Sequence, residues 1–231
     1  MITIVPIGGR PRAARRGRWV PAMVIALATA GVFAGASAGA SGRAFAAAAS
    51  PAAEDPGREL SRRLARSGSG EARFERVTAD ALSGRDVRVR GRIVLEPPDR
   101  VLLRFESTGE RLSLRGDGGE WLQPSLRQMI VLTAAQAGAA RAWWAVLAGA
   151  APEGITIRPD GAHRFVLRSG EAAGTTARLT LDRAGLPASL DLDEDGSRSA
   201  YRFSAWTFAA ARGRSAFVQK APSGFEVVRL P

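Results

Sequence analysis

The feature that most constrains the fold is an alternation of apolar and polar residues with a period of two. In residues 87–95, apolar side chains and Gly91 alternate with Arg88, Arg90 and Arg92. Successive side chains of a strand point to opposite faces, so this segment predicts a strand with one apolar face and one cationic face. Similar segments follow along the chain, separated by clusters of Gly, Pro and Asp. Such a chain favours an antiparallel sheet of about eleven strands.

Two segments interrupt the strand pattern and predict helices. Residues 58–67 place Leu60 and Leu64 four positions apart on one helical face, and residues 134–149 are rich in Ala with Trp143 and Trp144. A sheet with one apolar face must curve around something or be covered, and these helices are the available covers. The expected strands lie around residues 87–95, 101–105, 112–114, 121–122, 126–133, 155–157, 165–167, 179–181, 190–192, 201–206 and 225–228.

The N-terminus has the order of a secretory signal peptide. An arginine-rich segment precedes an apolar run that begins at Trp19, and small residues with candidate cleavage sites follow. A membrane anchor is the alternative, but several Gly and Ser residues dilute the run. We expect residues 1–46 to be a cleaved signal peptide, residues 47–57 a flexible leader, and residues 58–231 one domain in the periplasm.

The net charge and the lack of cysteine exclude several classes of function. The formal net charge is +11, but six arginines fall in the first 46 residues, and without them it is +5. No basic stripe is interleaved with stacking aromatic residues, so we expect no nucleic-acid partner. The chain has no Cys. Disulfides, thiolate metal sites, cysteine catalysis and an N-terminal lipid anchor on Cys are therefore excluded.

Candidate catalytic and metal-binding residues are few. The only histidine, His163, starts an expected strand and reads as an exposed hairpin residue. Asp191, Asp193 and Asp195 match the first half of a calcium loop, but Arg202 stands at the position of the closing acid, and a solvated turn is the simpler interpretation. We therefore expect no enzyme, no cofactor and no metal site.

Three motifs follow one another along the chain. Residues 91–98 with Arg104 and Phe105 have the pattern of a glycine, a strand and a proline turn, residues 117–124 that of an Asp-Gly, Trp and Pro hairpin, and residues 217–227 that of a closing element with Phe, Pro, Gly and Val. In this order the motifs resemble those of the LolA family of periplasmic carriers of outer-membrane lipoproteins. The resemblance runs from about residue 58 to the end. The receptor of the same fold, LolB, is lipid-anchored, and the absence of Cys argues against that assignment.

The resemblance implies an α+β, mainly β fold: a strongly curved antiparallel sheet of about eleven strands, or half-open barrel, under a lid of two or three short helices. It also implies a monomer that receives acyl chains of lipoproteins from an inner-membrane ABC transporter and passes them to an outer-membrane receptor. The family carries an arginine beside the proline of the first motif that helps to hold the lid. Here Glu96 or Pro97 occupies that position, and Arg100 is the nearest arginine.

Alternation and the resemblance together predict the lipid-binding residues. Adjacent residues of a helix point about 100° apart, so Trp143 and Trp144 cannot both enter one tight core. We expect lid side chains to fill the groove when it is empty and cargo to displace them. A sensor or adaptor of the same fold, or a carrier of another amphiphile such as a glycolipid, remains an alternative. The predicted groove residues are Val89, Ile93, Leu103, Phe105, Leu114, Leu167, Leu181 and Phe203, and the predicted lid residues are Trp143, Trp144 and Leu147.

Overall fold

The computed structural model describes residues 56–79, 85–147, 154–169, 176–194 and 197–229. The expected signal peptide and most of the expected leader lie outside these residues. Among them, no helix is long and apolar enough to cross a membrane.

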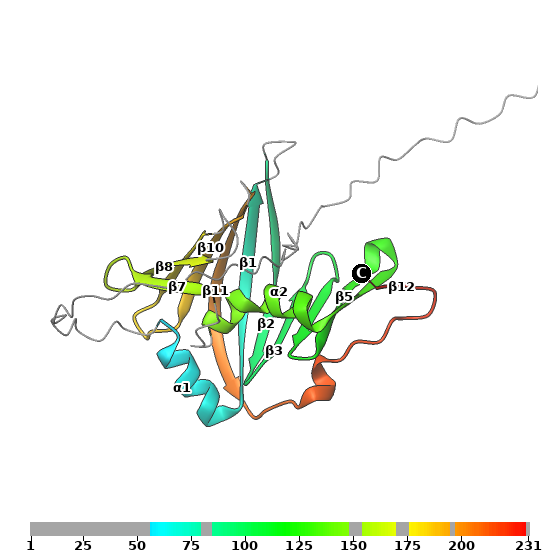
Figure 1. Cartoon of the computed structure of the whole chain (residues 1–231), viewed down its shortest axis with the longest axis horizontal. Coiled ribbons are helices and arrows are strands. Elements are labelled where there is room, and N and C mark those ends of the chain that lie inside the picture. The colour runs from blue at the N-terminus through cyan, green and yellow to red at the C-terminus, as the bar shows by residue number, and fades with distance from the viewer. Residues whose placement is uncertain (1–55, 80–84, 148–153, 170–175, 195–196, 230–231) are drawn as a thin grey trace, which may run out of the picture.

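A single curved, unclosed sheet of twelve strands makes up most of the described chain (Figure 1). Its order is β12-β6-β5-β4-β3-β2-β1-β11-β10-β9-β8-β7, and β12 pairs with β6 in parallel while the other pairs are antiparallel. The strands are β1 (Ser69–Ala79), β2 (Asp86–Glu96), β3 (Arg100–Phe105), β4 (Arg111–Arg115), β5 (Gly118–Gln123), β6 (Gln128–Leu132), β7 (Ile155–Pro159), β8 (Arg164–Ser169), β9 (Thr176–Leu181), β10 (Pro187–Glu194), β11 (Ser197–Ala209) and β12 (Glu226–Arg229).

The mainly β architecture and the eleven expected strands are confirmed. The twelfth strand, β1, is the one that the sequence pattern missed, although it lies at the centre of the sheet between β2 and β11. Its pairing with β11 shifts register between Glu71 and Arg73, opposite a stretch that contains Ala205 at φ 54°. A bulge of this kind bends a strand and strengthens its twist, which helps the long strands β1 and β11 to follow the curve of the sheet.

Two α-helices lie against the sheet (Figure 1). Helix α1 (Arg58–Ser67) buries Leu60 and Leu64 and packs on β1 and β11. It lies near the first residues of β1, where Leu64 is next to Gly70. Helix α2 (Ala134–Leu147) runs across the concave face and contacts β4, β5 and β6. The side chains of Thr133 and Gln136 each bond the other's backbone N–H, at 3.3 and 2.9 Å, and this capping box defines where α2 begins.

The outer face of the same sheet is covered near β3 to β5 by a segment after β11. We call residues 212–219 the outer strap; it contains the 3₁₀ turn η2 (Arg214–Phe217). Phe217 is fully buried and forms a small apolar cluster with Val94 and Leu102, separate from the main core. Strands β4 and β5 therefore lie between α2 on the concave face and the outer strap on the opposite face.

Candidate functional site: the concave face

The predicted groove residues share one face of the sheet and one apolar cluster. Seven of the eight are buried in this cluster, and Leu181 is half-buried against it. They come from strands that are distant in the sequence, β2, β3 and β4 on one side and β8, β9 and β11 on the other. The alternation therefore assigned the faces of these strands correctly. That the residues bind lipid stays a prediction.

Aromatic residues that the sequence reasoning did not select complete the floor of the concave face. The Phe74 ring lies 5.5 Å from that of Phe105 and 5.8 Å from that of Tyr201, measured between ring centroids. Phe74 can lie flat across the neighbouring strand because residue 91 is glycine: a Cβ at Gly91 would fall 2.6 Å from the Phe74 ring. Tyr201 is one of the two buried aromatic residues of β11, and its burial follows from the same alternation that selected Phe203.

Helix α2 fills the concave face with side chains from its C-terminal half. Trp144 is buried and sets its edge on the Tyr201 ring, with centroids 5.2 Å apart and ring planes at 88°. Val146 and Leu147 are also buried in the main cluster, whereas Trp143 is half-buried at its margin. The two tryptophans therefore have different environments. Of the predicted lid residues, Trp144 and Leu147 are buried in the main cluster, and that they act as a lid stays a prediction.

One polar contact joins α2 to the turn between β2 and β3. The Arg141 guanidinium donates to the backbone carbonyl of Asp99 at 3.2 Å and lies 3.6 Å from its carboxylate. Asp99 also accepts the backbone N–H of Gly116 at 2.7 Å. The side chains of Arg141 and Asp99 are about one quarter and one third exposed. The cation of this contact sits on the helix, and the acceptor sits in the turn.

Glu96, which with Pro97 is one of the two residues expected at the position of the family's lid arginine, points to the opposite face. Its buried carboxylate accepts the backbone N–H groups of Arg212 at 2.6 Å and Gly213 at 3.2 Å, and it pairs with Arg100. These groups belong to the outer strap and the β2–β3 hairpin. Glu96 therefore holds the outer strap rather than the helix over the concave face.

The outer face carries the guanidinium groups that the alternation predicted. Glu75 pairs with Arg90 at 3.2 Å, and Glu71 pairs with Arg92 and Arg212. Burial raises the pKa of Glu71, but hydrogen bonds from Arg212 and Arg92 outweigh it and bring the pKa below its ordinary value. This cross-strand pairing neutralises much of the positive charge of these arginines.

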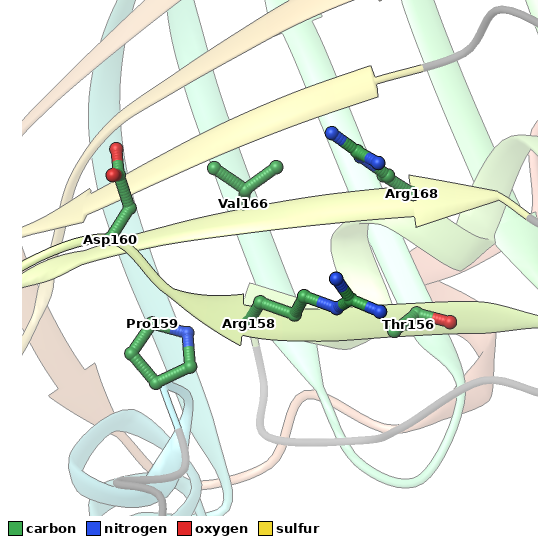
Figure 2. Close-up of a pocket in the computed structure, with 6 residues that line it drawn as sticks. All are labelled: Thr156, Arg158, Pro159, Asp160, Val166 and Arg168. Atoms are coloured by element: carbon green, nitrogen blue, oxygen red, sulfur yellow. The ribbon is translucent and has the colours of Figure 1, made fainter.

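A surface depression on β7 and β8 is not part of the apolar site. It is lined by Thr156, Arg158, Pro159, Asp160, Val166 and Arg168 (Figure 2). These residues alternate with Ile157, Phe165 and Leu167, which face the core, so the depression opens on the outer face. Its exposed arginines suit a polar surface and not a hydrocarbon chain.

The other sequence candidates occupy ordinary structural positions. Asp191 pairs with Arg202 at 2.7 Å and Asp193 pairs with Arg198 at 3.3 Å, both across β10 and β11. These two aspartates are therefore on a strand and not in a calcium loop; Asp195 lies outside the described residues. His163 is exposed in the turn before β8. Among the described residues, no three His, Asp or Glu side chains are placed to share a metal ion.

The structure is similar to several solved structures of low sequence identity. A LolA superfamily protein from Nitrosomonas europaea is 10% identical over 74% of this chain and 99% of its own, with a TM-score of 0.48. An outer membrane lipoprotein-sorting protein domain from Vibrio parahaemolyticus is 13% identical over 69% and 94%, with a TM-score of 0.40. The lipoprotein LppX from Mycobacterium tuberculosis is 12% identical over 64% and 91%, with a TM-score of 0.32.

These neighbours include the superfamily that the sequence motifs resemble, and the likeness is one of general architecture. With every TM-score below 0.5, they support no conclusion about cargo or partners. No protein-family model and no curated protein matches the sequence.

Proposed function

We propose that the protein is a periplasmic carrier that binds the acyl chains of lipoproteins against its concave face, for transfer from the inner to the outer membrane. The observation that supports this proposal is the apolar cluster, which extends from Leu132 in β6 to Phe165 in β8 and includes the inner side of α2. The sheet that carries it is unclosed, so its two edges β7 and β12 are not joined to each other. Binding, and not catalysis, is the activity that such a surface supports.

The helix provides a way to bind hydrocarbon and still release it. A saturated chain of about sixteen carbons gains roughly 0.8 kcal/mol per buried methylene, or about 11 kcal/mol in total. Lifting Trp144, Val146 and Leu147 out of the cluster costs about 1.5–3 kcal/mol for each side chain that becomes exposed. The net affinity is the difference between these two burials, and it is a few kcal/mol instead of the whole transfer energy.

Two adjacent residues of β3 give a direct test of the binding face. Leu103 points to the concave face and Leu102 to the outer face, and both are at most 3% exposed. Leu103→Trp and Leu102→Trp should each destabilise the protein by about 1–3 kcal/mol through overpacking. Only Leu103→Trp should weaken binding of a fluorescent fatty-acyl probe, by tenfold or more, because it occupies the space that the chain needs. Equal affinities in the two folded variants would reject the concave face as the site.

The cargo and the cellular role need a separate experiment. Mass spectrometry of ligand extracted from the protein purified from its own cell envelope should reveal acyl chains attached to lipoprotein N-termini. A glycolipid in that extract would favour a carrier of another amphiphile. Co-purification with a signalling protein, without transfer of cargo to acceptor membranes, would favour a sensor or adaptor. An inner-membrane ABC transporter and an outer-membrane receptor are the partners that the carrier role requires.

A further inference from the structure

An arginine lies on the apolar face of the sheet, where a charged side chain is costly to place. Arg76 follows Phe74 by two residues in β1, and its cross-strand neighbours are Val89 and Tyr201, which belong to the main apolar cluster. Its guanidinium carbon lies 5.1 Å from the centre of the Phe105 ring. Arg76 therefore shares the concave face with the predicted groove residues.

Two further polar groups lie beside Arg76 on the same face. Glu110 comes two residues before Leu112 of the cluster and is 9% exposed. Its carboxyl group takes part in no ion pair within the described residues. The indole nitrogen of Trp121 and the charge of Arg76 both act on this carboxyl. Burial nevertheless raises the pKa of Glu110 above its ordinary value, since it outweighs the contact with Trp121 and the attraction of Arg76.

Two hydrogen-bond donors in this group are buried without an acceptor. Arg76 Nε and Trp121 Nε1 are inaccessible to solvent, and within the described residues neither donor has an acceptor in ordinary hydrogen-bonding geometry. The nearest candidate for Trp121 is the Glu110 carboxyl, whose pKa the indole N–H lowers, but the two groups do not reach that geometry. Arg76 also forms no ion pair with any described residue. Buried donors are nearly always satisfied in proteins, so a pair left without acceptors on a binding face suggests that a ligand supplies them.

The charges of the group favour a neutral acceptor. Arg76 and Glu110 balance each other when both are ionised, and a bound anion would face the carboxylate of Glu110. A carbonyl oxygen has the lone pairs to accept from both donors and brings no charge.

The distance from α1 to Arg76 along β1 suits the length of an acyl chain. Helix α1 packs beside Gly70, and the six residues from Gly70 to Arg76 span about 20 Å of strand. An acyl chain can lie along the apolar floor between these two ends.

From this arrangement, and resting on the proposed binding of acyl chains, we propose that Arg76 and Trp121 bind the ester carbonyl at the head of an acyl chain. The substrate class is then an acyl ester, distinguished from hydrocarbon and from ether lipid by these two donors. Glu110 compensates the charge of Arg76 and keeps the site neutral overall.

The test compares an oleoyl glycerol ester with its ether analogue, which keeps the chain and removes the carbonyl. The wild-type protein should bind the ester about tenfold more tightly than the ether, the effect of one or two net hydrogen bonds. Trp121→Phe removes the N–H and keeps an aromatic ring, so it should reduce the preference for the ester over the ether to about threefold.

Trp206→Phe is the matched control. Its indole N–H already donates to the Pro187 carbonyl at 2.9 Å, so its removal should leave the ratio of ester to ether affinity unchanged. Equal binding of ester and ether by the wild-type protein, or an unchanged ratio in Trp121→Phe, would overturn the ester site while acyl binding stands. Tighter binding of the oleate anion than of the ester would also overturn it. Binding of none of these probes would instead reject the proposed function.

Discussion

The two coverings of the central strands are held by different kinds of interaction. On the concave side, α2 contributes Trp144, Val146 and Leu147 to an apolar cluster, with Arg141 and Asp99 as its polar contact to the β2–β3 turn. On the outer side, the strap is held by buried charge-assisted hydrogen bonds as well as by Phe217. One covering depends on burial that a ligand can replace, and the other on directional bonds that a ligand cannot replace.

The centre of the outer covering is a two-pronged ion pair. Arg115 donates from both terminal nitrogens to the Glu120 carboxylate at 2.6 Å, and one of them also donates to the Phe217 carbonyl at 2.6 Å. The Glu120 carboxylate further accepts the Gln219 backbone N–H at 3.3 Å, and Ser113 bonds the Phe217 carbonyl. Hydrogen bonding to Glu120 raises the pKa of Arg115 above its ordinary value, against the effect of burial. Such a network fixes the strap in one position.

The largest expected effect comes from breaking this outer network. Glu120→Gln keeps the shape of the side chain but removes the buried counter-charge of Arg115, so that only the half-exposed carboxylate of Asp117, 3.2 Å from Arg115 Nε, remains. We expect the free energy of unfolding to fall by about 3 kcal/mol or more, measured by urea denaturation. Glu226→Gln, at an exposed position of β12, is the control and should change stability by less than about 0.5 kcal/mol. If Glu120→Gln lowers the free energy of unfolding by less than about 1 kcal/mol, the outer strap does not depend on this ion pair and the contrast with α2 is wrong.

The second prediction concerns the concave covering and separates stability from affinity. Leu147 in α2 and Leu60 in α1 are both fully buried, so truncation to Ala should cost about 2–5 kcal/mol of unfolding free energy in each case. Only Leu147→Ala should also raise the affinity for a fatty-acyl probe, by several fold, because the ligand then displaces less apolar surface. Urea denaturation measures the stability of the two variants, and titration with the fluorescent probe measures their affinity. Unchanged or weaker binding in Leu147→Ala would mean that α2 is a fixed part of the core.

A smaller effect is expected from the polar contact of α2. The pair of Arg141 and Asp99 is partly exposed, so Arg141→Ala should lower the unfolding free energy by less than about 1 kcal/mol. The same change should raise probe affinity about two- to fivefold and quicken binding in stopped-flow measurements, since the helix is released more easily. Arg158→Ala, on the outer face of β7, should alter neither quantity. Slower binding by Arg141→Ala would contradict a restraining role for the contact.

The regular strands and both helices could be predicted from the sequence because their burial follows one period. Strand β1 was missed for a physical reason: its inward positions include Arg76 and Thr78, so the apolar alternation that begins at Ala72 and Phe74 stops halfway. Arg76, which interrupts the pattern, is also the arginine of the concave face that forms no ion pair within the described part of the chain. Local irregularity of this kind is expected where function competes with folding.

The outer strap could not be predicted, because it depends on contacts between residues about one hundred positions apart. All six residues of β5 are buried, including Glu120 on the outer face, although alternation predicts that every second side chain faces water. The burial of Glu120 results from the docking of the outer strap, whose Gln219 backbone N–H it accepts, and no local pattern indicates this contact. Alternation predicted the strands that form the floor of the concave face, and residue composition predicted the helix above it. The polar group at Glu110 and Trp121 was not predicted, because it too depends on long-range contacts.

The smallest expected effect is a pH dependence that the concave face has and the outer ion pairs do not share. A carboxyl whose pKa is raised by folding, such as Glu110, stabilises the protein below its unfolded pKa of about 4.5, and this contribution is lost as the pH rises through the folded pKa. Glu71 and Asp117 have lowered pKa values and act with the opposite sign, with stability lost as the pH falls. They are present in both the wild type and Glu110→Gln, so they cancel in a comparison of the two. The stability of the wild type relative to Glu110→Gln, followed by urea midpoints from about pH 4 upwards, should therefore decrease as the pH rises. A difference that stays constant or grows over this range would show that Glu110 is not buried on the concave face, and the neutral binding site argued for Arg76 and Trp121 would lose its third member.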